Sequence, residues 1–135
     1  MDLKSKRQSG FIPGLEGLAA VAGLLISVVL LSLNSARAKS RNAKRLADVR
    51  QMASALELYF NDKTKYPDTL KELTPVYLGI IPSATLPPDG TCAPEENNYA
   101  YHKISTEKYE LTFCLGAATS GYREGVRMLS EQGIK

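Results

Sequence analysis

The sequence is poor in the residues on which most enzyme active sites depend. His102 is the single histidine among 135 residues. It falls within a predicted strand, so neither a histidine-based catalytic triad nor a metal site with several histidines is expected. The glycine-rich patterns that bind phosphate, G-x-x-x-x-G-K and G-x-G-x-x-G, do not occur either. We therefore predict that the chain is not an enzyme and uses no cofactor.

Charge is absent from Gly17 to Leu33, a run of seventeen residues. As a helix this run is about 25 Å long, close to the lower limit for crossing a bilayer. The basic leader of residues 1–10 favours a cytoplasmic N-terminus, whereas the more basic residues 37–50 favour the opposite orientation. The two cysteines beyond the run suggest an oxidising compartment, so we expect a single-pass membrane anchor with an extracytoplasmic head. The alternative is a cleaved secretory signal, because Ala36-Arg37-Ala38 has the A-x-A form of a cleavage site. A small secreted binding module would then be released after Ala38.

Cysteine is scarce, and the two residues of this type are Cys92 and Cys114. An even pair beyond an export segment predicts one disulfide, since the compartment there is oxidising. Closing a loop of about 23 residues would stabilise the head by roughly 3 kcal/mol in the chain-entropy model. Two separate buried thiols are the alternative.

The charges are distributed unevenly. Residues 37–50 carry a net charge of +5, and residues 51–135 carry −3. No aromatic residue is interleaved with the basic run, so a solvated or inter-subunit face is preferred to nucleic-acid binding, which stays open. A calcium site could form from the residues Asp89, Glu95, Glu96, Asn97 and Asn98. They lack EF-hand spacing, so a solvated acidic loop is preferred and no metal is predicted.

Hydrophobic periodicity predicts the fold class. No proline or glycine interrupts residues 24–66, so one helix is expected from about Leu15 to Asn61. The core face expected beyond the apolar run contains Ala43, Leu46, Val49, Ala53, Leu56 and Phe60, flanked by Met52 and Tyr59. The residues expected on its remaining surface are Arg41, Lys44, Arg45, Asp48 and Gln51.

The rest of the chain is predicted to form a small head. A short helix is expected within residues 68–77, and residues 99–104, 109–115 and 125–130 are predicted as strands. The fold class is therefore α+β. A long N-terminal helix, transmembrane in its first half and amphipathic in its second, packs on a small antiparallel sheet.

The N-terminal sequence resembles that of type IV pilins and of type II secretion pseudopilins. The resemblance covers residues 7 to about 67 and rests on Gly10-Phe11, Glu16, the apolar run and LNSARAKSRNAKRLADVRQMASALELYFNDKTKYP. In that family a prepilin peptidase cuts after the leader glycine, and the new N-terminal residue is methylated. The resemblance implies Gly10 and Phe11 as processing residues, and Phe11 and Glu16 as assembly residues. Glu16, sixth from Phe11 where the family has its glutamate fifth, would pair with the N-terminal amine of a neighbouring subunit.

The resemblance also implies an organisation and partners. Residues 1–10 would be the prepilin leader, 11–36 the transmembrane and fibre-core half of the helix, 37–61 its amphipathic neck half, and 62–135 the head. The expected product is a subunit that polymerises with itself into a type IV pilus or pilus-like fibre at the cell surface. Other implied partners are the prepilin peptidase, an assembly platform with its ATPase, and the inner membrane that holds the precursor. A pseudopilin of a periplasmic secretion pseudopilus or a DNA-uptake machine is the alternative with the same fold.

Overall fold

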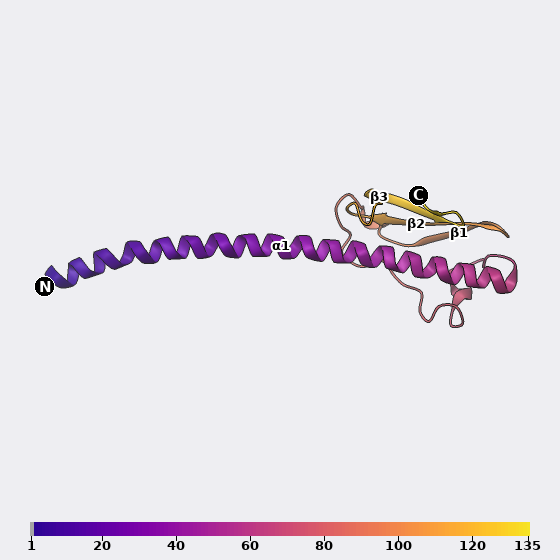
Figure 1. Ribbon diagram of the computed structural model, residues 1–135, viewed down its shortest axis with the longest axis horizontal. Coiled ribbons are helices and arrows are strands. Elements are labelled where there is room, and N and C mark those ends of the chain that lie inside the picture. The colour runs from indigo at the N-terminus through magenta and orange to yellow at the C-terminus, as the bar shows by residue number, and fades with distance from the viewer. Residues whose placement is uncertain (1) are drawn as a thin grey trace. The chain divides into compact units, whose positions relative to one another are not determined.

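A single helix, α1, runs from Asp2 to Lys63 in the computed structural model of the protein (Figure 1). The structure describes the backbone of residues 2–135 and the side chains of residues 18–135. The chain divides into two compact units, Met1–Arg37 and Ala38–Lys135. The helix predicted from about Leu15 to Asn61 is confirmed over that range. It is longer at both ends, because it begins at Asp2 and ends at Lys63.

The first unit consists of helix alone. Every side chain from Leu18 to Leu33 is exposed, and we call these residues the anchor segment. The Ser27 hydroxyl donates a hydrogen bond to the Gly23 carbonyl at 2.9 Å, so this polar side chain is satisfied within its own helix. Between Leu18 and Lys63 the helix contains a stretch long and apolar enough to cross a membrane, and none of that stretch is buried.

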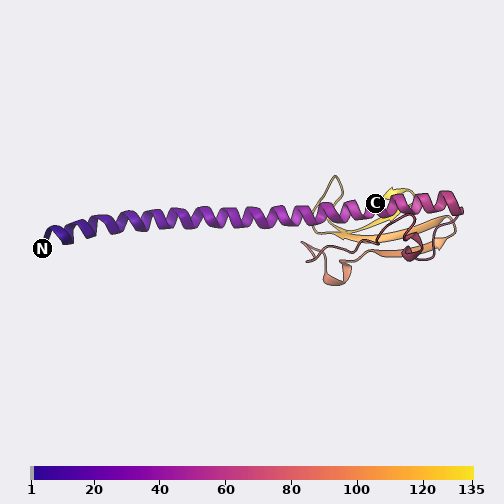
Figure 2. The ribbon, with the colours of Figure 1, turned by 90° about the horizontal axis from the view of Figure 1, so that it is seen from below.

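The second unit places the C-terminal part of α1 against a four-stranded antiparallel sheet (Figures 1 and 2). The strands are β1 (Ala100–Ser105), β2 (Lys108–Leu115), β3 (Gly125–Ser130) and β4 (Gly133–Ile134). Neighbours in the sequence are neighbours in the sheet, in the order β1-β2-β3-β4. The α+β class predicted from the sequence is confirmed.

The core of this unit lies between the helix and one face of the sheet. Tyr109, Leu111, Phe113 and Leu115 alternate along β2 and are buried, as the two-residue period of a strand requires. The helix supplies residues that recur at three- and four-residue spacing, namely Leu46, Val49, Met52, Ala55, Leu56 and Tyr59. Burying a side chain of this size stabilises the fold by about 1.5–3 kcal/mol.

The N-terminal end of the core face differs from the sequence-based expectation. Ala43 was expected inside but is exposed, and Asn42 is buried beside it. Arg45 and Asp48 were expected on the surface but are buried. The reason is that polar groups from later segments cover this end of the helix. Residues 85–89 supply acceptors to Arg45, the Tyr99 hydroxyl bonds to Asp48, and the Gly116 N–H bonds to Asn42.

Two smaller elements also differ. The short helix expected within residues 68–77 is a single 3-10 turn, η1 (Leu70–Leu73), in which Leu73 is buried. Strand β4 was not predicted, because its two residues are too few for an alternating pattern. It forms by pairing Leu129 with Ile134 and Ser130 with Gly133.

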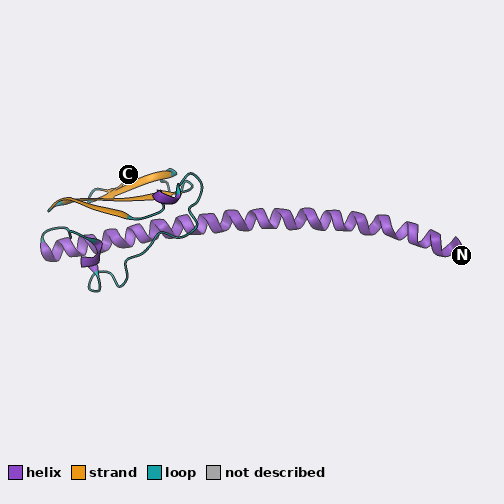
Figure 3. Ribbon diagram, turned by 180° about the vertical axis from the view of Figure 1, so that it is seen from behind, coloured by secondary structure: helices purple, strands orange, loops and turns teal. Residues whose placement is uncertain are grey.

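Residues 64–99 connect α1 to the sheet and contain η1 and a second 3-10 turn, η2 (Pro94–Glu96). Figure 3 shows η1 on the opposite side of the helix from the strands. Glu72 attaches η1 to the helix. Its Oε2 accepts a hydrogen bond from the Tyr59 hydroxyl at 2.8 Å, and its Oε1 accepts one from the backbone N–H of Asp68. The connection therefore brings a polar partner, the Glu72 carboxylate, to the helix.

Candidate functional site

The residues implied in processing and assembly are Gly10, Phe11 and Glu16. Their backbone belongs to α1, but their side chains lie outside the described residues. Their roles stay predictions.

The anchor segment is the first functional feature among the described side chains. Leu24 is 70% exposed and Leu31 is 71% exposed, although both are among the most apolar residue types. Contiguous apolar surfaces larger than a few hundred Å² mark membrane or protein contacts. The segment can therefore insert into lipid or pack against other apolar helices.

The polar centre of the second unit is the guanidinium group of Arg45, which is 1% exposed. Nε donates to Asn97 Oδ1 at 3.1 Å, and Nη1 donates to Asn42 Oδ1 at 2.9 Å and to Asp89 Oδ2 at 2.8 Å. Nη2 donates to the carbonyls of Thr85 and Pro87 at 2.7 and 2.8 Å. A guanidinium has five N–H donors, so every donor of Arg45 has an acceptor.

Asp89 joins this centre to a second arginine. Arg41 Nε donates to Asp89 Oδ2 at 2.9 Å, and Arg41 Nη2 donates to Oδ1 at 2.6 Å. This two-point geometry is a strong form of ion pair. The hydrogen bond from Arg41, helped by that from Arg45, holds the pKa of the Asp89 carboxyl below its usual value against the opposing effect of burial. Asp89 is therefore the anion that fastens residues 85–89 to α1.

Two glycines allow the Asp89 loop to approach the end of β2. A Cβ on Gly116 would lie 2.3 Å from the Asp89 carbonyl oxygen, and a Cβ on Gly90 would lie 1.8 Å from the Gly116 oxygen. Gly90 also has a φ of +54°, which favours glycine. Beside this contact the Gly116 N–H donates to Asn42 Oδ1 at 3.0 Å, so the helix, the loop and the strand meet here.

Cys92 and Cys114 form a disulfide next to the same contact. Cys114 follows Phe113 on β2, so its side chain lies on the sheet face that points away from the helix. The bond thus fastens the loop to the outer face, while the arginines fasten it to the helix. A disulfide was expected from the two cysteines, and the structure contains it.

The basic run of residues 37–50 is partly neutralised inside the second unit. Asp89 binds Arg41 and Arg45, and Lys44 Nζ lies 2.9 Å from Asp48 Oδ1. The Tyr99 hydroxyl donates to Asp48 Oδ2 at 2.8 Å. These contacts leave fewer cations for an external partner than the sequence indicates. The one-turn spacing of Arg41 and Arg45 was the signal that both could share an acid.

The loop considered for calcium is not a set of free acids. Asp89 is bound to two arginines, Asn97 accepts from Arg45, and Glu96 Oε2 accepts the Ala93 N–H at 2.9 Å. Among the side chains of residues 18–135 no group of three or more His, Cys, Asp and Glu is placed to hold a metal ion. The expectation of a solvated loop was wrong for Asp89, which is 8% exposed.

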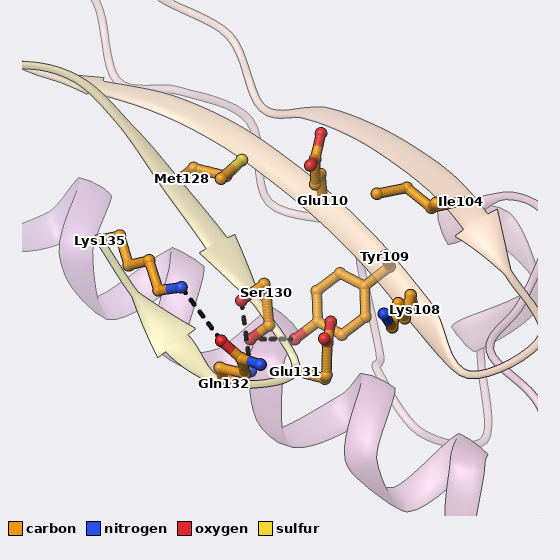
Figure 4. Close-up of a pocket in the computed structure, with 9 residues that line it drawn as sticks. All are labelled: Ile104, Lys108, Tyr109, Glu110, Met128, Ser130, Glu131, Gln132 and Lys135. Carbon is orange, nitrogen blue, oxygen red and sulfur yellow. Dashed lines mark hydrogen bonds between the residues drawn. The ribbon is translucent and has the colours of Figure 1, made fainter.

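A hollow of about 320 Å³ lies beside β2, β3 and β4 (Figure 4). Its lining mixes apolar side chains, such as Ile104 and Met128, with charges of both signs. Lys135 Nζ donates to Gln132 Oε1 at 3.0 Å, and the Tyr109 hydroxyl donates to the Ser130 carbonyl at 3.4 Å. These polar groups bond to one another and are not directed at a common point, so the lining does not resemble a catalytic site.

Comparison of the chain with protein-family models, curated proteins and solved structures finds no match. The architecture is nevertheless pilin-like. It combines a long helix with an apolar N-terminal segment, a four-stranded antiparallel sheet on the later part of that helix, and a disulfide.

Proposed function

We propose that the chain is a structural subunit of a type IV pilus or of a related pilus-like fibre. The observation that carries this proposal is the anchor segment, sixteen consecutive exposed residues without charge. They belong to the helix whose later residues form the core of a disulfide-containing unit. An apolar helix surface of this kind needs lipid or other helices around it. The helix of a fibre subunit would be surrounded by the bilayer before assembly and by neighbouring helices after it.

The proposal assigns no catalytic step to this chain. A prepilin peptidase would cut between Gly10 and Phe11, and a membrane platform with its ATPase would drive polymerisation. What supports this division is the makeup of the chain itself, with one histidine and no phosphate-binding glycine pattern.

Glu16 would act during assembly. In the apolar bundle of a fibre its carboxylate would compensate the charged amine of Phe11 on a neighbouring subunit. Unit charges at about 4 Å attract by near 4 kcal/mol at an effective dielectric of 20, and a buried charge without its mate costs about 3–5 kcal/mol. Because Glu16 is sixth from Phe11, it lies about 100° around the helix from the family's position.

Substitution of Glu16 tests this role. Glu16→Ala should abolish or sharply reduce fibres while the precursor is still inserted and cut, and Glu16→Asp should be intermediate because the charge remains on a shorter side chain. Sheared fibres are quantified against total cell-associated subunit. If Glu16→Ala formed fibres at wild-type levels, the pairing role would be contradicted, and Glu16 would be only a carboxylate at the membrane interface.

The experiment that tests the proposal as a whole is N-terminal sequencing of the mature protein by mass spectrometry. N-methylated Phe11 is the expected terminus. Gly10→Val should leave the full-length precursor in the membrane, because the peptidase site needs a small residue there, and Gly10→Ala is the matched small control. Normal shortening of Gly10→Val would contradict the assignment.

A secreted binding module is the second candidate, and one observation favours it. The second compact unit begins at Ala38, so cleavage after that residue would leave Arg41, Arg45 and their partners intact. Lys39 would then be the mature N-terminus, and the same sequencing experiment separates the two functions. Immunoelectron microscopy separates a surface pilus from a periplasmic pseudopilus.

A further inference from the structure

Six cations lie in residues 37–50, and the structure divides them into two groups. Arg41, Arg45 and Lys44 bind Asp89 or Asp48 within the second unit. The other three, Arg37, Lys39 and Arg50, are exposed and form no ion pair among the side chains of residues 18–135.

The sequence around two of these cations contains no compensating acid. No Asp or Glu occurs between Gly17 and Ala47. The next acid along the helix, Asp48, already binds Lys44 and Tyr99. No acid among the described side chains therefore compensates Arg37 or Lys39.

Arg37 and Lys39 follow the anchor segment closely. They lie four and six residues beyond Leu33 in the continuous helix α1, which is about 6 and 9 Å of helical rise. A phospholipid headgroup layer is roughly 5–8 Å thick on each side of the hydrocarbon, and flexible cationic side chains reach several Å back toward it. If the anchor segment lies in the hydrocarbon, both charges reach this layer.

The two side chains leave the helix in different directions. Residues two positions apart are separated by about 200° around the axis, so Arg37 and Lys39 lie on nearly opposite sides. One acidic group of a protein partner cannot neutralise both. Lipid headgroups surround a membrane helix on every side and can do so.

We propose that Arg37 and Lys39 form a cationic collar that binds the phosphate groups of anionic phospholipids while the subunit is in the membrane. Guanidinium and ammonium groups are the usual protein ligands of phosphate. The collar would fix the depth of the anchor segment and retain the subunit next to anionic lipid before assembly. The inference rests on the membrane-inserted precursor of the proposed function.

The test uses the full-length chain reconstituted in vesicles of phosphatidylcholine and phosphatidylglycerol. Carbonate extraction first checks that the chain is inserted. Electron paramagnetic resonance of spin-labelled lipids then measures how strongly the protein prefers phosphatidylglycerol to phosphatidylcholine. A cation near an anionic membrane surface changes binding by up to about fivefold, so we expect a several-fold preference in the wild-type protein that weakens at high salt.

Substitutions locate the preference. Arg37→Gln and Lys39→Gln should each reduce the preference for phosphatidylglycerol. In the double variant the ratio of phosphatidylglycerol to phosphatidylcholine association should be close to one. Arg50→Gln is the matched control, because Arg50 is also exposed and without an ion pair but lies 17 residues beyond Leu33, about 25 Å away. It should leave the preference unchanged.

The outcomes separate the collar from the proposed function. An inserted chain whose lipid preference is unchanged in the double variant, or falls equally in Arg50→Gln, overturns the collar alone. A chain that carbonate releases overturns the membrane anchor itself. If the double variant changes self-association in pure phosphatidylcholine vesicles and not lipid preference, the cations bind a second copy, and the lipid assignment is wrong.

Discussion

Helix α1 has two described parts with opposite surroundings. In the anchor segment Leu24 is 70% exposed, whereas in the second unit Leu46 is 1% exposed, although both are leucines of one continuous helix. The later part is stabilised by the sheet and the 64–99 connection. Among the described residues of its own unit the anchor segment has no such partner, so its apolar surface is open to lipid or to other apolar helices.

Charge follows the same division. The second unit brings Arg45 into its interior and satisfies each of its donors, whereas the anchor segment has no charge at all. Burial of a charge is tolerated where the chain supplies acceptors. The two parts of α1 are therefore adapted to different surroundings. Substitutions in the second unit should change its stability, whereas substitutions in the anchor segment should change membrane insertion.

The largest expected effect is that of Arg45→Met. This change leaves five acceptor contacts without their donor group, and breaking a buried charge pair costs about 3–5 kcal/mol. The free energy of unfolding, measured in detergent by denaturant titration with near-ultraviolet circular dichroism, should fall by that amount. Arg50→Met, at an exposed position, should stay within about 0.5 kcal/mol of wild type. Equal stability of the two variants would contradict the role of Arg45.

The complementary change in the other region is Leu25→Arg, at the middle of the anchor segment. An arginine at the centre of a membrane helix disfavours insertion by about 3 kcal/mol. The carbonate-resistant fraction should therefore fall, while the unfolding of the second unit in detergent should not change. Leu25→Ile controls for the substitution itself. If Leu25→Arg destabilised the second unit, the two regions would not be independent.

The disulfide should matter to the second unit alone. Its partners are 22 residues apart, and closing such a loop stabilises a fold by roughly 3 kcal/mol in the chain-entropy model. Cys92→Ala combined with Cys114→Ala should lower the free energy of unfolding by about that much and leave membrane insertion unchanged. Reduction of the wild-type protein with dithiothreitol is the matched control and should give a similar loss. Two freely alkylatable thiols in the oxidised wild-type protein would rule the bond out.

The smallest expected effect is the acid sensitivity contributed by Asp89. Its pKa in the folded state is lowered, chiefly by the hydrogen bond from Arg41, and an unfolded aspartate titrates near 3.9. Its contribution to stability is therefore fully present above about pH 4 and is lost as the pH falls through the folded-state pKa.

Unfolding free energies measured from pH 6 to pH 2 check this sign. Asp89→Asn should remove part of the decrease below about pH 4 and lower stability at neutral pH. Asp68→Asn is the comparison, because the Asp68 pKa is also lowered, by Lys103, but its side chain is 73% exposed and contributes little. An unchanged acid slope in Asp89→Asn would contradict the assignment.

Local patterns were sufficient to predict much of this fold. The absence of proline and glycine from residues 24–66 predicted the later part of α1. The alternation in residues 99–104, 109–115 and 125–130 predicted three of the strands. The core face of α1 was predicted only in part, because Ala43 was expected inside. The small strand β4 was missed since its pairing is set by the neighbouring β3 and not by its own two residues.

By itself, the sequence determined that one segment is long and apolar enough to cross a membrane, that a long helix contains it, and that two cysteines can pair. These properties depend on composition and on short periodicities that any window of the chain reveals. Only the tertiary structure decided which charges are internal. Arg41 and Arg45 both bind Asp89, which is 48 and 44 residues away in the sequence. Because of this long-range contact, two cations expected on the surface instead hold the Asp89 loop against α1. Arg37 and Lys39 differ in this respect, because no acid among the side chains of residues 18–135 forms an ion pair with them.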